Sequence, residues 1–130
     1  FKCLNLTIVN MEKLILPQEL EVWYLIPAIR KELAKELIRQ GLKQREAAEK
    51  LGLTEAAVSQ YLKGKRASDI EFGKKVREDI RKSAKKILKG GCFIGEIQVI
   101  CRECKKNMVL CKIHRKHGHV SPTCKICLKT

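Results

Sequence analysis

Residues 42 to 66, with the sequence LKQREAAEKLGLTEAAVSQYLKGKR, constrain the fold of this chain most strongly, because they carry the signals for two short helices joined by one tight turn. Small and apolar residues recur at helical spacing, and Gly52 follows where a helix can end in the left-handed conformation. Thr54 suits an N-cap, because its hydroxyl can accept a hydrogen bond from a free backbone N–H. The pattern predicts a helix over residues 44 to 51 and a second helix that begins after Thr54 and ends at Gly64.

The two predicted helices must approach each other closely. Ala48 is small enough to allow this approach, and Val58 and Leu62, four residues apart, give the second helix an apolar underside. The side chains expected to project from the other side of the second helix are Glu55, Ala56, Ser59, Gln60 and Lys63.

This run resembles the phage-repressor helix-turn-helix, the Cro-like or Xre-type class of transcriptional regulator. The residues that carry the resemblance are Gln44, Ala48, Gly52, Thr54, Val58 and Ser59. Together with the preceding helix (Tyr24, Pro27, Ala28 and Arg30), the chain is similar to small archaeal regulators of this class with a cysteine-rich, metal-binding C-terminal tail.

The resemblance implies sequence-specific binding of double-stranded DNA, with the second helix in the major groove. Its N-terminal residues would read base edges, Gln44 and Thr54 would hold phosphates, and Lys65 and Arg66 would lie where the phosphate backbone passes. The predicted DNA-binding residues are Gln44, Thr54, Glu55, Ala56, Ser59, Gln60, Lys63, Lys65 and Arg66.

Net charge agrees with a nucleic-acid partner. The formal charge is +14 and the sequence pI is about 9.7, so the chain attracts polyanions with a strong dependence on salt. The sequence contains no apolar run long enough to span a membrane, and we expect a cytoplasmic, nucleoid-associated protein. Met11 is an alternative start, and residues 1 to 10 receive no role.

The predicted fold is mainly α-helical, with four segments. Residues 1–16 form an N-terminal arm, and 17–66 form a λ-repressor-like helix-turn-helix domain. Residues 67–91 form a basic amphipathic helix and a Gly-Gly linker, and 92–130 form a cysteine-rich metal-binding domain with a short β-hairpin. A long helix is expected from Pro17 to Gly41, in which Pro27 either introduces a kink or, more economically, marks the first turn.

The segment after the second helix predicts a long basic helix that extends to about Lys89, with Ser68 or Asp69 as its cap. One stripe of this helix carries the small and apolar residues Ile70, Gly73, Val76, Ile80, Ala84, Ile87 and Leu88. The stripe is typical of a core or dimer contact. We favour a homodimer, because helix-turn-helix proteins usually read two half-sites about one DNA turn apart.

Six of the seven cysteines and all three histidines follow Gly91. A segment this short needs disulfides or a metal to stay folded, and a reducing compartment favours the metal. The pairs Cys101-x-x-Cys104 and Cys124-x-x-Cys127 match the two knuckles of a zinc ribbon. Residues 94 to 100 and 108 to 110 suggest the strands of a hairpin that carries the first knuckle.

The ligand set stays open at this point. Cys101, Cys104, Cys111 and His114 form an alternative Cys₃His set, so the metal candidates are Cys101, Cys104, Cys111, His114, Cys124 and Cys127. Zn²⁺ fits such a site, and a [4Fe–4S] cluster that senses oxygen, iron or redox state is the alternative.

Two classes of function remain. No phosphate-binding loop, nucleophile elbow or deaminase pattern occurs in the sequence, which argues against an enzyme. The alternative to a DNA-binding regulator is an RNA- or ribosome-associated zinc protein. That alternative lacks interleaved aromatic residues, since Phe93 is the only aromatic residue beyond residue 72.

Overall fold

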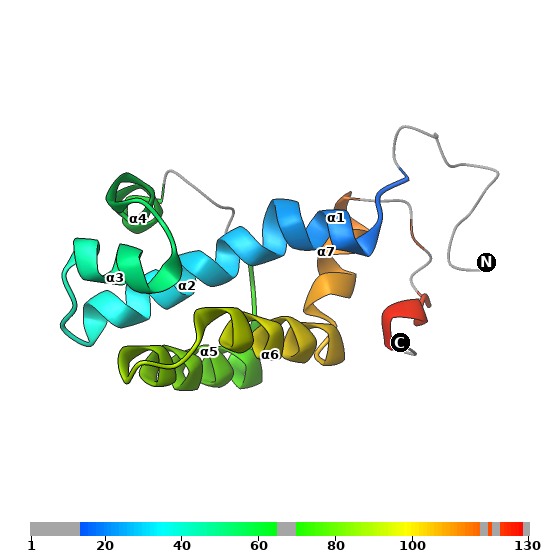
Figure 1. The fold of residues 1–130 in the computed structure, drawn as a ribbon. Helices are drawn as coiled ribbons and strands as arrows, with labels where there is room; N and C mark the ends of the chain where they lie inside the picture. Colours follow the sequence, from blue (N-terminus) through cyan, green and yellow to red (C-terminus); the bar gives the residue numbers. More distant parts are fainter. Residues whose placement is uncertain (1–13, 65–69, 118–119, 121–122, 129–130) are drawn as a thin grey trace.

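The computed structural model describes residues 14–64, 70–117, 120 and 123–128, and these residues form helices and turns without a β-strand. Figure 1 shows one long helical rod with the other helices packed along it. The elements in chain order are α1 (Pro17–Leu20), the π-helix η2 (Glu21–Leu25), α2 (Ile26–Arg39), α3 (Gln44–Leu51), α4 (Glu55–Leu62), α5 (Gly73–Leu88), α6 (Phe93–Lys106), α7 (Val109–His117) and the 3₁₀-helix η3 (Ile126–Leu128).

The rod consists of α1, η2 and α2, and the chain stays helical through Pro27 (Figure 1). Pro17 occupies the first turn of α1, where its missing N–H costs nothing. Pro27 lies inside the rod, directly after the π-helical turn in which the Ile26 N–H donates to the Glu21 carbonyl. This wider turn accommodates a proline that would otherwise clash with the preceding turn. Pro27 therefore lies in the first turn of α2, as the sequence predicted, although the chain before it is already helical.

The two short helices α3 and α4 have the bounds that the sequence predicted. Gly52 follows α3 in the left-handed conformation, with φ 63°, and Thr54 caps α4. Gly64, with φ 70°, follows the last turn of α4. Ala48 and Val58 are buried where the pair packs together and onto α2.

The basic helix α5 begins at Gly73, later than expected, and the predicted caps Ser68 and Asp69 lie outside the described residues. Its apolar stripe packs against α2 and α6 of the same chain, with Val76, Ile80 and Ala84 buried. The stripe is therefore part of the core and is not available as a dimer contact.

Gly90 and Gly91 form a tight helix-to-helix turn between α5 and α6. The Gly90 N–H donates to the Ile87 carbonyl at 3.0 Å, and the Gly91 N–H donates to the Lys86 carbonyl at 2.7 Å. This pair of bonds is a Schellman motif, with Gly90 at φ 96°. A Cβ on Gly91 would lie 2.7 Å from the Lys86 oxygen. Both positions therefore need glycine, and the turn lets α6 fold back against α5.

The predicted β-hairpin of the cysteine-rich segment is wrong. Residues 94 to 100 belong to α6, and residues 109 and 110 begin α7. Ile97, Ile100 and Cys104 recur at helical spacing and are buried, whereas Ile94 and Val99 are exposed. A short run with this many apolar residues does not by itself distinguish a strand from a helix, and packing against α5 decides for the helix.

A single core runs from α1 to α7. Its members include Leu33 and Leu37 of α2, Val76 of α5, Ile100 of α6 and Leu110 of α7. Helices α6 and α7 therefore share their apolar core with the helix-turn-helix. Among the described helices, none combines the length and the apolar character that crossing a bilayer requires.

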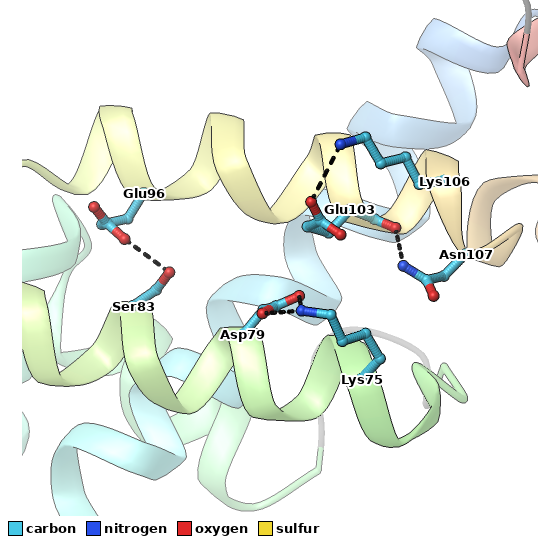
Figure 2. A network of polar contacts seen from close by, with 7 residues as sticks. All are labelled: Lys75, Asp79, Ser83, Glu96, Glu103, Lys106 and Asn107. Atoms are coloured by element: carbon cyan, nitrogen blue, oxygen red, sulfur yellow. Dashed lines mark hydrogen bonds and ion pairs between the residues drawn. The ribbon is translucent and has the colours of Figure 1, made fainter.

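A polar contact joins α5 to α6, and other polar contacts lie within each of these helices (Figure 2). The buried Ser83 hydroxyl donates to Glu96 Oε1 at 2.8 Å, which links the two helices directly. Lys75 pairs with Asp79 within α5 at 3.0 Å. The Asn107 amide donates to the Glu103 carbonyl at 2.8 Å and closes the last turn of α6.

Candidate nucleic-acid interface and cysteine positions

The N-terminus of α4 is built by Thr54. Its backbone is extended, and its hydroxyl oxygen accepts a hydrogen bond from the Ala57 N–H at 3.1 Å. The hydroxyl hydrogen is still available to donate, and the Thr54 side chain is exposed. The cap can therefore hold the helix end and also donate to a phosphate oxygen.

The face of α4 that points away from the core carries the predicted base-reading residues. Glu55, Ala56, Gln60 and Lys63 are exposed, and Ser59 is half-buried. In Figure 1, α4 lies at the end of the long rod beside α3, at the edge of the molecule. These five side chains therefore share one accessible surface.

The inward face of α4 contains two residues that the sequence analysis did not identify. Ala57 and Tyr61 are buried together with Val58, while Leu62 is only partly buried. Ala57 and Tyr61 are four residues apart, so they share one side of the helix, but this spacing alone does not decide that the side is buried. They set the rotation of α4 and hence which side chains it exposes.

Gln44 is exposed at the first turn of α3, next to Lys43 and Arg45, which are also exposed. The Lys43 backbone N–H donates to Glu46 Oε1 at 3.2 Å and completes the helix start. Arg45 approaches Glu49 at 3.6 Å on the open surface, where such a pair is weak. Lys43 and Arg45 are thus additional phosphate-contact candidates, which the sequence analysis missed although they adjoin Gln44.

Two of the predicted DNA-binding residues, Lys65 and Arg66, lie outside the described residues. They follow Gly64 directly, so they continue the chain beyond the C-terminal end of α4.

The first cysteine pair lies on a helix. Cys101 and Cys104 occupy consecutive turns near the C-terminal end of α6, and Cys104 is buried in the core. Burial raises the pKa of Cys101 to about 11 and that of Cys104 to about 12. Both side chains are therefore thiols at neutral pH. The expected knuckle at this pair is absent, because the backbone here is α-helical.

The remaining candidate ligands lie on α7 and around η3. Cys111 and His114 are half-buried and three residues apart on α7, so they share one side of that helix. Burial lowers the pKa of His114, and its ring bonds to the Ile15 backbone. Cys124, before η3, and Cys127, within η3, are half-buried. Within the described residues, no group of three or more His, Cys, Asp or Glu side chains is placed to hold a metal ion.

Comparison with known families supports the interpretation of the middle of the chain. Residues 31–85 match a family described as "Helix-turn-helix". The match starts within α2, covers α3 and α4, and ends within α5. The match and the positions of α3 and α4 therefore agree on a helix-turn-helix within residues 31–85. No curated protein and no solved structure matches the chain.

Proposed function

We propose that this protein is a sequence-specific, double-stranded-DNA-binding transcription regulator. The observation that carries the proposal is the exposed face of α4, with Thr54 capping its start and Ser59 and Gln60 on the outward side. Amide and hydroxyl side chains at this position can bond to base edges in the major groove. The family match at residues 31–85 supports the same function.

Phosphate binding is the second element of the proposal. The net charge of +14 supplies the long-range attraction, and Gln44, Thr54, Lys65 and Arg66 would hold the phosphate backbone. Lys43 and Arg45 add two cations at the start of α3. Substitutions of base-reading residues and of phosphate-holding residues should therefore have different effects on DNA binding.

The experiment is selection of a preferred duplex from a random pool, followed by affinity measurements over a range of salt concentrations. Gln60→Ala should lower the preference for the selected duplex, whereas Lys43→Ala should weaken all duplexes about equally and flatten the salt dependence. Gln98→Ala and Lys112→Ala are matched controls, because both residues are exposed and lie on α6 and α7. Equal effects of Gln60→Ala and Gln98→Ala would contradict the proposal.

An RNA-associated role is the alternative, and competition distinguishes the two. A structured RNA of the same length should displace the selected duplex poorly if α4 reads the major groove, because the major groove of A-form RNA is too narrow for a helix. Displacement at equal concentration would favour the RNA-binding role.

A homodimer remains part of the proposal, because two half-sites one turn apart would need two reading heads. The contact surface cannot be the apolar stripe of α5, which is covered by α2 and α6. Sedimentation of the protein with and without the selected duplex tests whether two copies assemble.

We propose in addition that the cysteine-rich end of the chain binds a metal ion. The observation that favours a metal is that η3, between Cys124 and the end of the described residues, contains no buried residue. Apolar packing therefore contributes little to holding this segment, and a metal ion is the usual replacement in so small a unit.

The donor chemistry favours Cys111, His114, Cys124 and Cys127 over the α6 pair. Cys104 would have to leave the apolar core and lose its proton to bind a metal. The preferred set gives three thiolates and one imidazole, which suits Zn²⁺. The segment that holds Cys124 and Cys127 would need to close on α7, since the described residues form no ready site.

Anaerobic purification with metal analysis tests this proposal. Colourless protein with one zinc per chain supports a structural site, and brown protein with iron and sulfide supports a [4Fe–4S] cluster. Cys111→Ser or Cys124→Ser should abolish the metal, while Cys92→Ser, at an exposed cysteine outside the set, should retain it. Protein that contains neither zinc nor iron would contradict the proposal.

A further inference from the structure

A cavity of about 370 Å³ lies where η2, the segment before α5, and α7 meet. This volume is at the lower end of the range for small-molecule sites. The residues that line the cavity are Tyr24, Ile70, Glu71, Val109, Lys112, Ile113, Lys116 and His117.

Part of the cavity wall is apolar and belongs to the protein core. Val109 and Ile113 belong to the buried core, and Ile70 packs against the same core. Tyr24 stacks on His117, with ring centroids 4.3 Å apart and an angle of 7° between the ring planes. A bound molecule with an apolar or planar body would therefore meet a preformed surface.

The charged part of the lining is mainly cationic. Lys112 and Lys116 are four residues apart on α7, so both ammonium groups can reach the same side of the cavity. Within the described part of the chain, neither lysine has an ion-pair partner, and Glu71 is the one carboxylate in the lining. An anionic group on the ligand would gain two charge-assisted hydrogen bonds there.

The cavity is separate from the proposed DNA-reading surface. Helix α7 packs against α1, at the opposite end of the long rod from α3 and α4 (Figure 1). Its concave apolar wall also differs from what a phosphodiester backbone requires, which is an open row of donors.

We propose that this cavity binds a small organic anion, a carboxylate or phosphate ester carried on an apolar or planar body. Lys112 and Lys116 hold the anionic group, while Val109, Ile113 and the stacked Tyr24 ring contact the body. The two lysines select against cations, and the limited volume selects against large ligands. The site uses none of the DNA-reading residues of α4 and none of the four proposed metal ligands.

Calorimetric titration of the full chain with phenyl phosphate tests the proposal, with Lys112→Gln and Lys116→Gln as site variants. We expect saturable one-to-one binding with a Kd of about millimolar or below, as is usual for a ligand of this size. Each variant should weaken binding roughly five- to tenfold. Lys82→Gln, an equal charge change at an exposed residue of α5 outside the cavity, should leave the Kd unchanged.

Three further measurements separate the contribution of the anionic group from that of the apolar body. Inorganic phosphate, which lacks the body, and benzylamine, which reverses the charge, should both bind much more weakly than phenyl phosphate. Amide chemical-shift changes on adding phenyl phosphate should map to residues 70–71 and 109–117. Equal binding of inorganic phosphate, equal binding of benzylamine, or displacement of phenyl phosphate by a DNA duplex would each overturn the proposal.

Discussion

Replacing Ile100 by alanine tests whether α6 and the helix-turn-helix belong to one cooperative unit. The Ile100 side chain is fully buried, in the cluster that also contains Leu33 of α2 and Val76 of α5. Removing three buried carbons from a packed site costs about 2–5 kcal/mol, and we expect about 3 kcal/mol here because the site is completely enclosed. A chain of this size has roughly 5–15 kcal/mol of stability in total. The variant should therefore lose a large part of it.

Urea denaturation followed by circular dichroism measures this loss. Ile94→Ala is the matched control, because Ile94 lies on the same helix with 69% of its surface exposed and should cost less than about 0.5 kcal/mol. Both variants should unfold in one transition with an unchanged m-value. If Ile100→Ala shifted the midpoint no more than Ile94→Ala, or split the transition into two steps, the single shared core would be refuted.

Three other predictions follow from local contacts. Thr54→Ala should lose about 1 kcal/mol of stability, whereas Thr54→Ser should keep it. Serine retains the hydroxyl that accepts a hydrogen bond from the Ala57 N–H at 3.1 Å. Equal losses in the two variants would argue against the cap. Ser83→Ala should lower the free energy of unfolding in urea by roughly 1–2 kcal/mol, because it removes the hydroxyl that donates to the Glu96 carboxylate at 2.8 Å between α5 and α6. An unchanged midpoint would contradict this expectation. At pH 8, iodoacetamide should modify the exposed Cys92 much faster than Cys104. Burial raises the pKa of Cys104 to about 12 and leaves almost no thiolate to react. Equal modification rates of the two cysteines, measured by peptide mass spectrometry, would contradict the buried position of Cys104.

The helix-turn-helix could be predicted from the sequence because its signals are local. Gly52 and Thr54 determine the turn through their own backbone and side-chain chemistry, whatever the rest of the chain does. The exposed face of α4 follows from the same spacing. Tyr61 was not assigned to the core, since a tyrosine can be buried or exposed and only its packing decides.

The C-terminal half was harder to predict from the sequence, because its structure depends on contacts between residues that are distant in the chain. Cysteine spacing alone suggested knuckles on a hairpin, but Ile97, Ile100 and Cys104 form one side of a helix that packs on α5. The Gly90–Gly91 pair looked like a linker and instead makes a tight turn. For α6 the deciding factor is an apolar surface supplied by α2 and α5, which local sequence patterns do not reveal, whereas the turn depends on the Schellman hydrogen bonds of Gly90 and Gly91.

The position of Pro27 shows the same limit on a smaller scale. A proline usually begins or kinks a helix, and both outcomes were compatible with the sequence. The π-helical turn at residues 21–25 provides a third solution, in which the preceding turn widens and the rod continues. Burial of Leu20, directly before this turn, and of Leu25, its last residue, stabilises it.

The ratio of affinities for a selected duplex and a scrambled duplex, measured at one fixed salt concentration, tests the central claim most directly. If the exposed face of α4 reads bases, the ratio should be about 10³ or more for the natural chain, and Gln60→Ala should lower it while Gln98→Ala does not. A ratio near one for the natural chain would mean that it binds DNA only through its charge, and would contradict the account.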